Sequence, residues 1–450
     1  MKTGSLMLTA LISLSPAMYG QATPTAATTN TSGFSLSPAL GGLSDGVVHY
    51  SLSAGEIVQH GLYSGSGWTS STSLGGGVGY VSRSERAPFS MLYSGGVLLT
   101  TQSVATVQTY QNASISQQYI TPRWVFGATD SVSYLPQSPT TGYSGIAGAG
   151  DAGSINGPSQ GPAGGILTNY GNRVSNALGV TIERRLTAAT SITGSSSWDI
   201  LRFIDNTGLD TTGISGTVGL NHRLSGRTTI NANAVYSIFY YGSYGSGVNV
   251  PNNPLNLSGL SYQTRGLNLG FQRLMTHSVT ISVSAGPQLI NSSNALLSPP
   301  VTTAFVSAAV TYTHRLTSAS ISYFHGGSGG SGVQQGSLAD SVTGAVSHTY
   351  SRDWQGSVSG GYTHSSALIQ SQAVNNLLGI NGTYNSFFGG VQATRRLGEH
   401  SSLYMSYTAI AQSSNSSPVP SSPNVYSGVG SIFSIGYTWA PRSTSLGQLF

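Results

Sequence analysis

The sequence predicts an all-β fold: a single transmembrane antiparallel up-and-down β-barrel of about 18 strands. The pattern allows roughly 16 to 20 strands. Three observations predict it: a repeated strand pair, an alternation of apolar and small polar residues, and a scarcity of charge. The repeat consists of short arginine-bearing segments about 40 residues apart, which leaves room for two strands and a longer loop. A meander of this kind removes its edges by closing into a barrel. The segments are 183–190, 221–228, 272–278, 313–320, 350–355 and 394–401.

The alternation of residue types has the period of two that is typical of β-strands. In 228–241, one face carries Ile230, Ala232, Ala234, Tyr236, Ile238 and Tyr240. The opposite face carries Thr229, Asn231, Asn233, Val235 and Ser237. The segments 277–285, 302–314 and 402–409 alternate in the same way. Each strand therefore has one bulky apolar face and one small polar face.

The polar face is unusual because it lacks charge. Only 6% of the residues are charged, whereas about 25–35% of a water-facing globular surface normally is. A soluble sandwich shows the same alternation with its polar face outward, but that face normally carries Lys and Glu. The composition therefore favours a wall between lipid and water. The net charge of +5 indicates nothing about nucleic acid, which we do not expect as a partner.

The alternation and the turn residues together predict the strands in order. They are 47–58, 72–82, 88–99, 104–120, 124–134, 174–184, 190–201, 212–223, 228–240, 262–273, 278–289, 303–314, 318–325, 341–350, 354–363, 384–395, 401–411 and 428–440. The first four are the weakest patterns. An even number of strands is typical of barrels with both ends in the periplasm.

The predicted connections alternate between short arginine turns and long segments rich in Gly, Ser, Pro and Asn. Outer-membrane barrels have short periplasmic turns and longer external loops, which sets the orientation. The long segments are 135–172, 241–261, 290–302, 325–340, 364–383 and 411–427. The segment 135–172 exceeds the usual loop length. It forms either an external loop, which we favour, or a constriction folded into the lumen.

The N-terminus has the features of a secretory signal peptide, residues 1–22. Lys2 precedes an apolar stretch from Leu6 to Leu14, and Gly20-Gln21-Ala22 matches a small-x-small cleavage site. We expect residues 23–44 to be a flexible periplasmic segment, followed by the barrel over 45–450. The sequence contains no cysteine, which excludes disulfides, thiolate metal sites and a lipoprotein anchor.

Arginine and aromatic residues near strand ends are predicted to anchor the barrel at the two membrane interfaces. An arginine facing lipid costs about 2–4 kcal/mol at the midplane and about 0–1 near the interface, and Trp and Tyr form interfacial girdles. The alternatives are a docking surface for a periplasmic component and, for a few tyrosines, carbohydrate stacking. The predicted anchors are Arg185, Arg223, Arg273, Arg315, Arg352, Arg396, Trp124, Trp439 and Tyr437.

No motif predicts a catalytic, cofactor or metal site, and we expect no enzyme. Asp199, Asp205, Asn206 and Asp210 offer oxygen ligands for Ca²⁺, but an ordinary loop is the better interpretation. The charged residues expected on the inner face are Glu183, Asp353 and Glu56.

Hydrolysis by an activated hydroxyl would require a histidine with an acidic or amide partner at one rim. Four histidines are expected toward the outer rim: His49, His60, His325 and His364. Because serine is so abundant, the sequence singles out no nucleophile.

The leader, the R-[RL]-[LT] turns, the segment DSVSYLPQSPTTG (130–142) and the final strand FSIGYTWAP (433–441) together resemble uncharacterised porin-like outer-membrane β-barrel proteins of Gram-negative-type bacteria. The resemblance covers nearly the whole mature chain. It implies export by the signal peptide and insertion into the bacterial outer membrane by the barrel-assembly machinery. Gly436, Tyr437 and Trp439 fit the C-terminal assembly signal, whereas Pro441 and the tail to Phe450 depart from it.

The leading expectation for function is a passive channel for hydrophilic solutes, or a porin associated with polysaccharide export, in contact with outer-membrane lipid. The alternative is a plugged structural or adhesive surface barrel that acts through external loops such as 135–172. A secreted β-solenoid predicts uniform repeats of about 20–30 residues, which the longer alternating repeat does not match.

Overall fold

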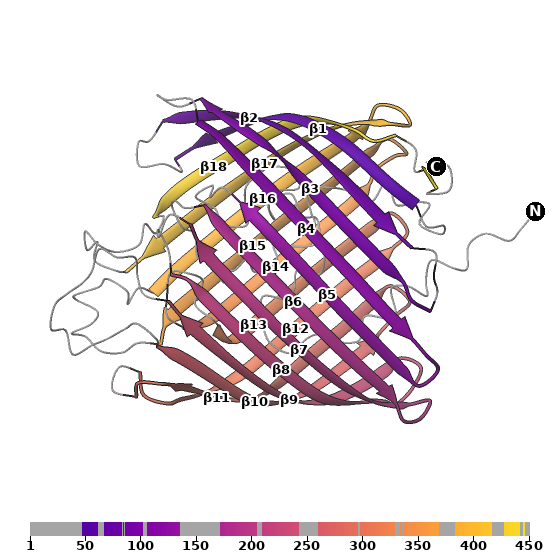
Figure 1. The fold of residues 1–450 in the computed structure, drawn as a ribbon, viewed down its shortest axis with the longest axis vertical. Helices are drawn as coiled ribbons and strands as arrows, with labels where there is room; N and C mark the ends of the chain where they lie inside the picture. The colour runs from indigo at the N-terminus through magenta and orange to yellow at the C-terminus, as the bar shows by residue number, and fades with distance from the viewer. Residues whose placement is uncertain are drawn as a thin grey trace, which may run out of the picture.

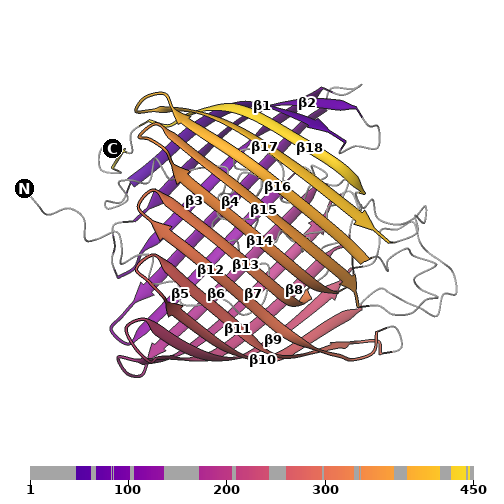
Figure 2. The same ribbon diagram turned by 180° about the vertical axis from the view of Figure 1, so that it is seen from behind.

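The fold is a closed, all-antiparallel β-barrel, seen from two sides in Figures 1 and 2. The computed structural model describes residues 47–61, 67–82, 84, 86–101, 106–135, 172–204, 209–242, 260–295, 298–328, 334, 336–368, 383–415, 427–441 and 444–445. The predicted signal peptide, the segment 23–44 and nearly all of the loop 135–172 lie outside the described residues.

In the described part of the chain, eighteen long strands and one short one form a single sheet. The long strands are β1 (Val47–His60), β2 (Trp68–Val81), β3 (Phe89–Thr101), β4 (Thr106–Ile120), β5 (Trp124–Leu135), β6 (Arg173–Arg185), β7 (Thr190–Phe203), β8 (Thr211–Arg223), β9 (Thr228–Tyr241), β10 (Ser261–Leu274), β11 (Val279–Ser292), β12 (Val301–His314), β13 (Thr317–Ser328), β14 (Ser337–Thr349), β15 (Trp354–Ala367), β16 (Thr383–Arg396), β17 (Ser401–Ser414) and β18 (Gly428–Trp439). The two-residue β19 (Thr444–Ser445) pairs with the start of β1. All eighteen predicted strands are confirmed, including the first four.

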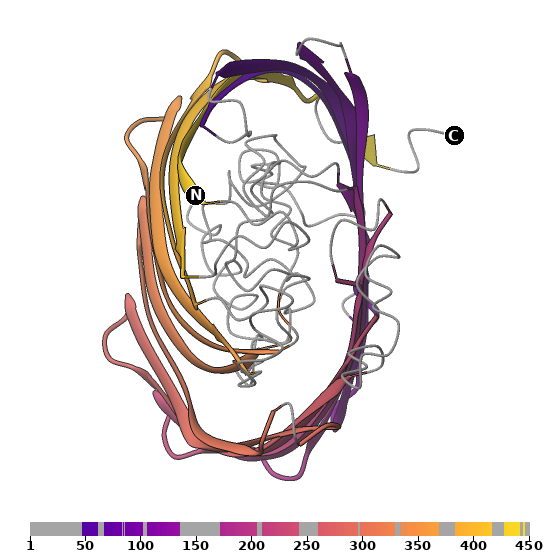
Figure 3. The ribbon, with the colours of Figure 1, turned by 90° about the vertical axis from the view of Figure 1, so that its left-hand side faces the viewer.

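Each strand pairs with its neighbours in the chain, and the first long strand pairs with the last. Leu52 of β1 lies opposite Trp439 of β18, and Ala54 lies opposite Tyr437. Viewed along the barrel, the strands form a closed oval ring (Figure 3). Because the strands alternate in direction, the start of β1 and the end of β18 lie at the rim that carries the short turns. We call this rim the short-turn end. We call the opposite rim the long-loop end.

The alternation in sequence becomes an outer and an inner face of the wall. On β9, Ala234, Tyr236 and Tyr240 are exposed, whereas Asn233 and Ser237 on the opposite face are buried. β11 follows the same rule, with exposed Val283 outside and buried residues such as Ser284 inside. The predicted assignment of the two faces is confirmed on these strands. Large apolar side chains gather on the outer face, which has no other layer of described structure over it.

Five of the short turns share one backbone hydrogen bond, in which an amide donates to the carbonyl four residues later. The donor–acceptor pairs are Leu186–Thr190 (2.9 Å), Leu224–Thr228 (2.9 Å), Met275–Val279 (2.9 Å), Tyr350–Trp354 (3.0 Å) and Leu397–Ser401 (2.8 Å). The turn between β12 and β13 is shorter, with only Arg315 and Leu316 between the strands. Arg315 has a positive φ of 46°, as tight two-residue hairpins require. The repeated arginine segments are thus the short turns that the sequence predicts.

The pairing of β10 with β11 is interrupted once, beside Pro287. The register runs from Gly266↔Gln288 to Leu269↔Ala285 with no paired residues between them. Proline has no amide hydrogen to donate to the ladder. At this point the backbone of Gly286 approaches β10 so closely that a Cβ atom there would lie 1.8 Å from the carbonyl oxygen of Leu267.

Within the described part of the chain, no helix is long and apolar enough to cross a membrane.

Candidate functional site: the inner wall and the two rims

The inner wall is lined mainly by small hydroxyl and amide side chains. Serine and threonine hydroxyls pair across neighbouring strands on this face. The pairs are Ser71–Thr100 (3.1 Å), Ser133–Ser175 (2.5 Å), Ser197–Ser215 (2.8 Å), Ser318–Ser347 (2.6 Å), Ser322–Thr343 (2.6 Å), Ser328–Ser337 (2.7 Å) and Ser406–Ser434 (2.5 Å). A hydroxyl both donates and accepts, so such a wall can exchange hydrogen bonds with an uncharged polar solute.

Charged side chains on the inner wall lie toward the strand ends. Arg173 begins β6, Glu183 lies two residues before its end, and Asp199 lies four residues before the end of β7. One carboxylate oxygen of Asp199 accepts from Ser197 (3.1 Å), while the other is buried and has no hydrogen-bond partner among the described residues. In the middle of the described inner wall, no position carries Asp, Glu, Lys or Arg. The wall therefore offers polarity without a ring of fixed charge.

Two of the three acidic residues expected on the inner face lie elsewhere. Glu56 shares a face with the exposed Leu52, so it points outward, where Thr72 (2.8 Å) and Ser70 donate to its carboxylate. The prediction for Glu56 is wrong: the period of two places residue 56 on the outer face, and hydrogen bonds from the neighbouring hydroxyls allow a carboxylate to lie there. Asp353 lies in the turn between β14 and β15 rather than on the wall. Only Glu183 is placed as predicted.

At the long-loop end, the tips of β13, β14 and β15 fold across the interior toward β10 and β11. The amide of Gly327 donates to the buried side chain of Gln288 on β11 (2.9 Å). A Cβ atom at Gly336 would lie 3.0 Å from the ring of Tyr262 on β10, four strands away around the wall. Ser298 donates to the carbonyl of Leu368 (2.9 Å). These contacts narrow the interior at this end.

An apolar cluster packs under these inward-folded tips. It comprises Leu209, Phe239, Tyr241, Leu260, Tyr262, Ile290 and Leu368, with Val301 and Leu338 against it. Phe305 and Phe324 form a second contact, edge to face, with ring centroids 5.8 Å apart. Burial of these large side chains stabilises the inward fold.

The predicted interface anchors all lie at the short-turn end. Arg315 and Arg352 are in turns, Arg185, Arg223 and Arg396 end their strands, and Arg273 lies one residue before the end of β10. Alternation places Arg273 on the outer face and the three strand-ending arginines on the inner face. Whether these residues contact lipid headgroups stays a prediction.

Aromatic anchors at the same rim are held by specific contacts. Trp124 stacks on Phe126 (ring centroids 5.7 Å apart), and Trp439 packs edge-on against Tyr50 (6.1 Å). The hydroxyl of Tyr437 lies 2.6 Å from that of Ser401. Two outward arginines that the sequence analysis did not name stack on tryptophan: Arg184 on Trp124 (5.2 Å) and Arg395 on Trp354 (5.3 Å). The sequence feature that could have identified them is the Arg-Arg pair that ends β6 and β16, because alternation turns the first arginine of each pair outward.

No group of three His, Cys, Asp or Glu side chains that could hold a metal ion occurs among the residues that the structure describes. Of the four residues considered for Ca²⁺, Asp205 and Asn206 lie outside the described residues. Asp210 instead contacts Arg202 (3.7 Å) and accepts from the amide of Phe203 (2.9 Å). The described residues thus give no support to a calcium site.

No family model matches the sequence, and no curated protein matches it. Among solved structures, the barrel is similar to OccK9 (OpdG) of Pseudomonas aeruginosa, with a TM-score of 0.43, 10% identity, and coverage of 89% of this chain and 99% of that one. OccK2 (OpdF) of the same species, in complex with glucuronate, gives 0.40, 9%, 87% and 97%. OccAB4 of Acinetobacter baumannii gives 0.43, 7%, 88% and 98%. At identities and TM-scores this low, the fold assignment rests on the chain's own strand pairing: over the residues that the structure describes, eighteen long strands form a closed β-barrel.

Proposed function

We propose that the protein is a bacterial outer-membrane channel that passes uncharged hydrophilic solutes. The observation that carries the proposal is the division of one closed wall into a bulky apolar outer face and a hydroxyl-rich inner face with no charge in its middle. The outer face suits acyl chains, because every backbone polar group of a closed barrel is paired within the wall. The inner face suits solutes rich in hydroxyl groups, because its own hydroxyls act as donors and acceptors. Barrels of this strand number leave room for an aqueous path.

The predictions from the sequence about export, membrane insertion, the solute and the interface residues are part of this proposal. Export by the signal peptide and insertion by the barrel-assembly machinery would bring the chain to the outer membrane. Saccharides are the polyhydroxylated solutes that match such a wall, which keeps the association with polysaccharide export within the proposal. The arginines and aromatic residues at the short-turn end would then lie at the periplasmic interface.

The first experiment is conductance of the purified full-length protein in planar bilayers. Stepwise increases in current are expected, together with uptake of neutral sugars by vesicles that contain the protein. A membrane that stays sealed at every voltage would reject the channel.

A charge placed on the inner wall should change ion selectivity. Ser195 lies on the inner face of β7, between Thr181 and Thr217 on the neighbouring strands. Ser195→Asp is expected to shift the reversal potential in a potassium chloride gradient toward cation selectivity, because the unaltered wall has no mid-height charge to compete with it. Ser225→Asp, in an exposed turn, is the control and should leave the reversal potential unchanged. The same shift in both variants would contradict the proposed conduction path.

The plugged structural or adhesive barrel stays a second candidate because several inward polar side chains are almost inaccessible to solvent. Ser237 and Ser434 are 0% exposed, and Asn268 and Gln288 are 2% exposed. This candidate predicts no conductance, and it predicts that deleting 135–172 abolishes partner binding without preventing insertion.

A further inference from the structure

Acidic residues are absent from a long stretch of the sequence that builds one side of the wall. Between Asp210 and Asp340 the sequence contains no Asp or Glu, and this stretch includes all of β8 to β13. Its arginines are Arg223, Arg227, Arg265, Arg273 and Arg315. All of them except Arg265 lie at the short-turn end, in turns or within one residue of a strand end. This side of the barrel therefore carries positive charge that no acidic residue of the same stretch balances.

Arg265 is exposed on the outer face of β10, four residues after the strand begins at the long-loop end. Its Cζ atom lies 5.9 Å from the ring centre of Tyr236, the residue directly opposite it on β9. One guanidinium nitrogen donates to Oε1 of Gln263 at 3.3 Å. In the described part of the chain, Arg265 forms no ion pair with a carboxylate. Since an arginine has several N–H donors, most of them remain available to a molecule that lies against the outer face.

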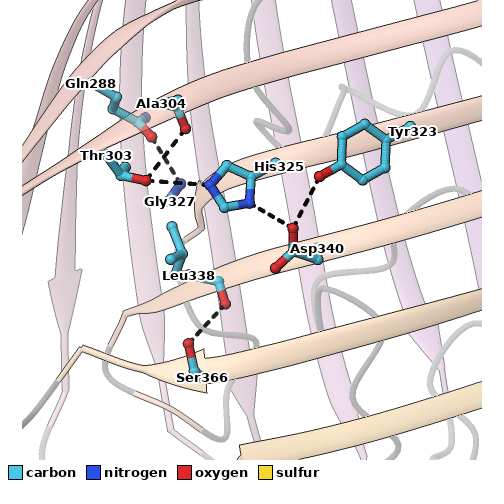
Figure 4. A network of polar contacts seen from close by, with 9 residues as sticks. All are labelled: Gln288, Thr303, Ala304, Tyr323, His325, Gly327, Leu338, Asp340 and Ser366. Atoms are coloured by element: carbon cyan, nitrogen blue, oxygen red, sulfur yellow. Dashed lines mark hydrogen bonds and ion pairs between the residues drawn. The ribbon is translucent and has the colours of Figure 1, made fainter.

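Other charged side chains near the long-loop end have charged or polar partners within the protein. Arg202 on β7 lies 3.7 Å from Asp210, and its Nη atoms donate to two backbone carbonyls and a hydroxyl. On β14, Oδ1 of Asp340 lies 2.6 Å from Nδ1 of His325 (Figure 4). Arg265 differs from both, because an aromatic ring and a neutral amide leave its charge unbalanced.

The surroundings of Arg265 change from polar to apolar along the strand. Toward the long-loop end, Gln263 lies directly opposite Asn291 of β11 on the outer face. Toward the barrel middle, Leu267 and Leu269 follow on the same face and are 65% and 72% exposed. An arginine in contact with acyl chains is costly, and a long side chain lowers that cost by reaching polar headgroups. Amides, a cation and a broad apolar surface thus follow one another in the order of a lipid headgroup and its acyl chains.

We propose that Arg265 binds the phosphate headgroup of an anionic lipid whose acyl chains lie over Leu267 and Leu269. A guanidinium binds a phosphate through two parallel hydrogen bonds, and Tyr236 holds the side chain in place for this contact. Because Oε1 of Gln263 accepts from Arg265, the amide nitrogen of Gln263 is free to donate to a further phosphate oxygen. The lipid belongs to the outer leaflet in the orientation proposed for the channel.

A lipid fits this surface better than free phosphate does, because the surface continues from the cation onto the two leucines. Burial of their exposed side chains against acyl chains adds to the affinity of the charged contact. The site lies on the outer face of the wall, so its occupation does not depend on whether the channel conducts.

The test is native mass spectrometry of the folded full-length protein in detergent, with phosphatidic acid added. The unaltered protein is expected to retain phosphatidic acid and to release phosphatidylcholine, which has no net charge. Arg265→Gln should weaken the binding of phosphatidic acid at least about tenfold, because charge-assisted hydrogen bonds are lost. Arg265→Lys should keep part of the affinity, since it keeps the charge without the planar fork.

Arg202→Gln is the matched control, because it removes a positive charge from the same rim and leaves Arg265 in place. Its affinity for phosphatidic acid should equal that of the unaltered protein. Equal weakening in Arg202→Gln and Arg265→Gln would mean that net charge alone attracts the lipid, and would overturn the proposal. Displacement of the lipid by inorganic phosphate would overturn it as well, in favour of a site for the free ion.

Cross-linking of the unaltered protein keeps the test valid if a variant fails to fold. A phosphatidic acid analogue with a diazirine in its acyl chain is expected to label residues 266–273, which trypsin releases as one peptide between two arginines. Excess phosphatidylcholine should not prevent this labelling. Labels spread evenly over the strands of the barrel would contradict a specific site at Arg265.

Discussion

Leu269→Arg is expected to lower the free energy of unfolding of the lipid-embedded barrel by about 2–4 kcal/mol. Leu269 is 72% exposed on the outer face of β10, between Ala232 and Ala285 on the neighbouring strands. It lies well away from both rims. An arginine at this position has to leave water for hydrocarbon. Equilibrium unfolding in urea, with the protein folded into lipid vesicles, measures the change.

The matched control is Met275→Arg. Met275 is 48% exposed in the short turn that follows β10, and an arginine at the interface costs only about 0–1 kcal/mol. The difference between the two variants reports depth in the bilayer, since the new side chain is the same. Equal costs at the two positions would mean that the outer face of β10 does not contact hydrocarbon.

Gly286→Ala is expected to destabilise the barrel by about 3 kcal/mol or more, at the upper end of the range for single substitutions. The new Cβ atom would lie 1.8 Å from the carbonyl oxygen and 2.8 Å from the carbonyl carbon of Leu267. Both are backbone atoms, so relief requires β10 and β11 to move apart beside Pro287. The effect is measured as the temperature at which the barrel unfolds. Unfolding is detected by the change in electrophoretic mobility of samples that are not boiled before the gel is run.

Gly194→Ala is the control for this prediction. Gly194 lies on β7, and a Cβ atom there would meet no atom within 4 Å. The change should shift the free energy of unfolding by no more than about 0.5–1 kcal/mol, with stabilisation expected because alanine restricts the unfolded chain. Comparable loss in both variants would show that close backbone approach is not the reason for glycine at 286.

The strands were predictable because each one repeats the same local pattern. In β9, for example, alternation alone assigns Tyr236 to the outer face and Asn233 to the inner one. The turns were predictable for the same reason: Leu186 and Leu224 begin equivalent hydrogen-bonded turns after equivalent arginine segments. A period of two needs no knowledge of distant residues, so one sequence is enough to find it.

The contacts that distinguish this barrel from a plain cylinder were not predictable in this way. The segment 325–340 reads as a glycine-rich loop, yet its two ends fold inward because Gly327 meets Gln288 and Gly336 meets Tyr262. The link from His325 to Asp340 depends on which residues of β13 and β14 lie opposite each other. Register across a long hairpin is set by the whole sheet, and histidines scattered along a sequence do not reveal it.

The pairing of β1 with β18 joins positions nearly four hundred residues apart and so has a consequence for biogenesis. Until the final strand arrives, both margins of the growing sheet expose unpaired amide and carbonyl groups, which must be shielded or matched by another protein. Because the start of β1 and the end of β18 lie at one rim, a circularly permuted gene that links these two strands and opens a long loop instead should preserve every ladder of hydrogen bonds, while the pair of strands that closes the barrel last changes.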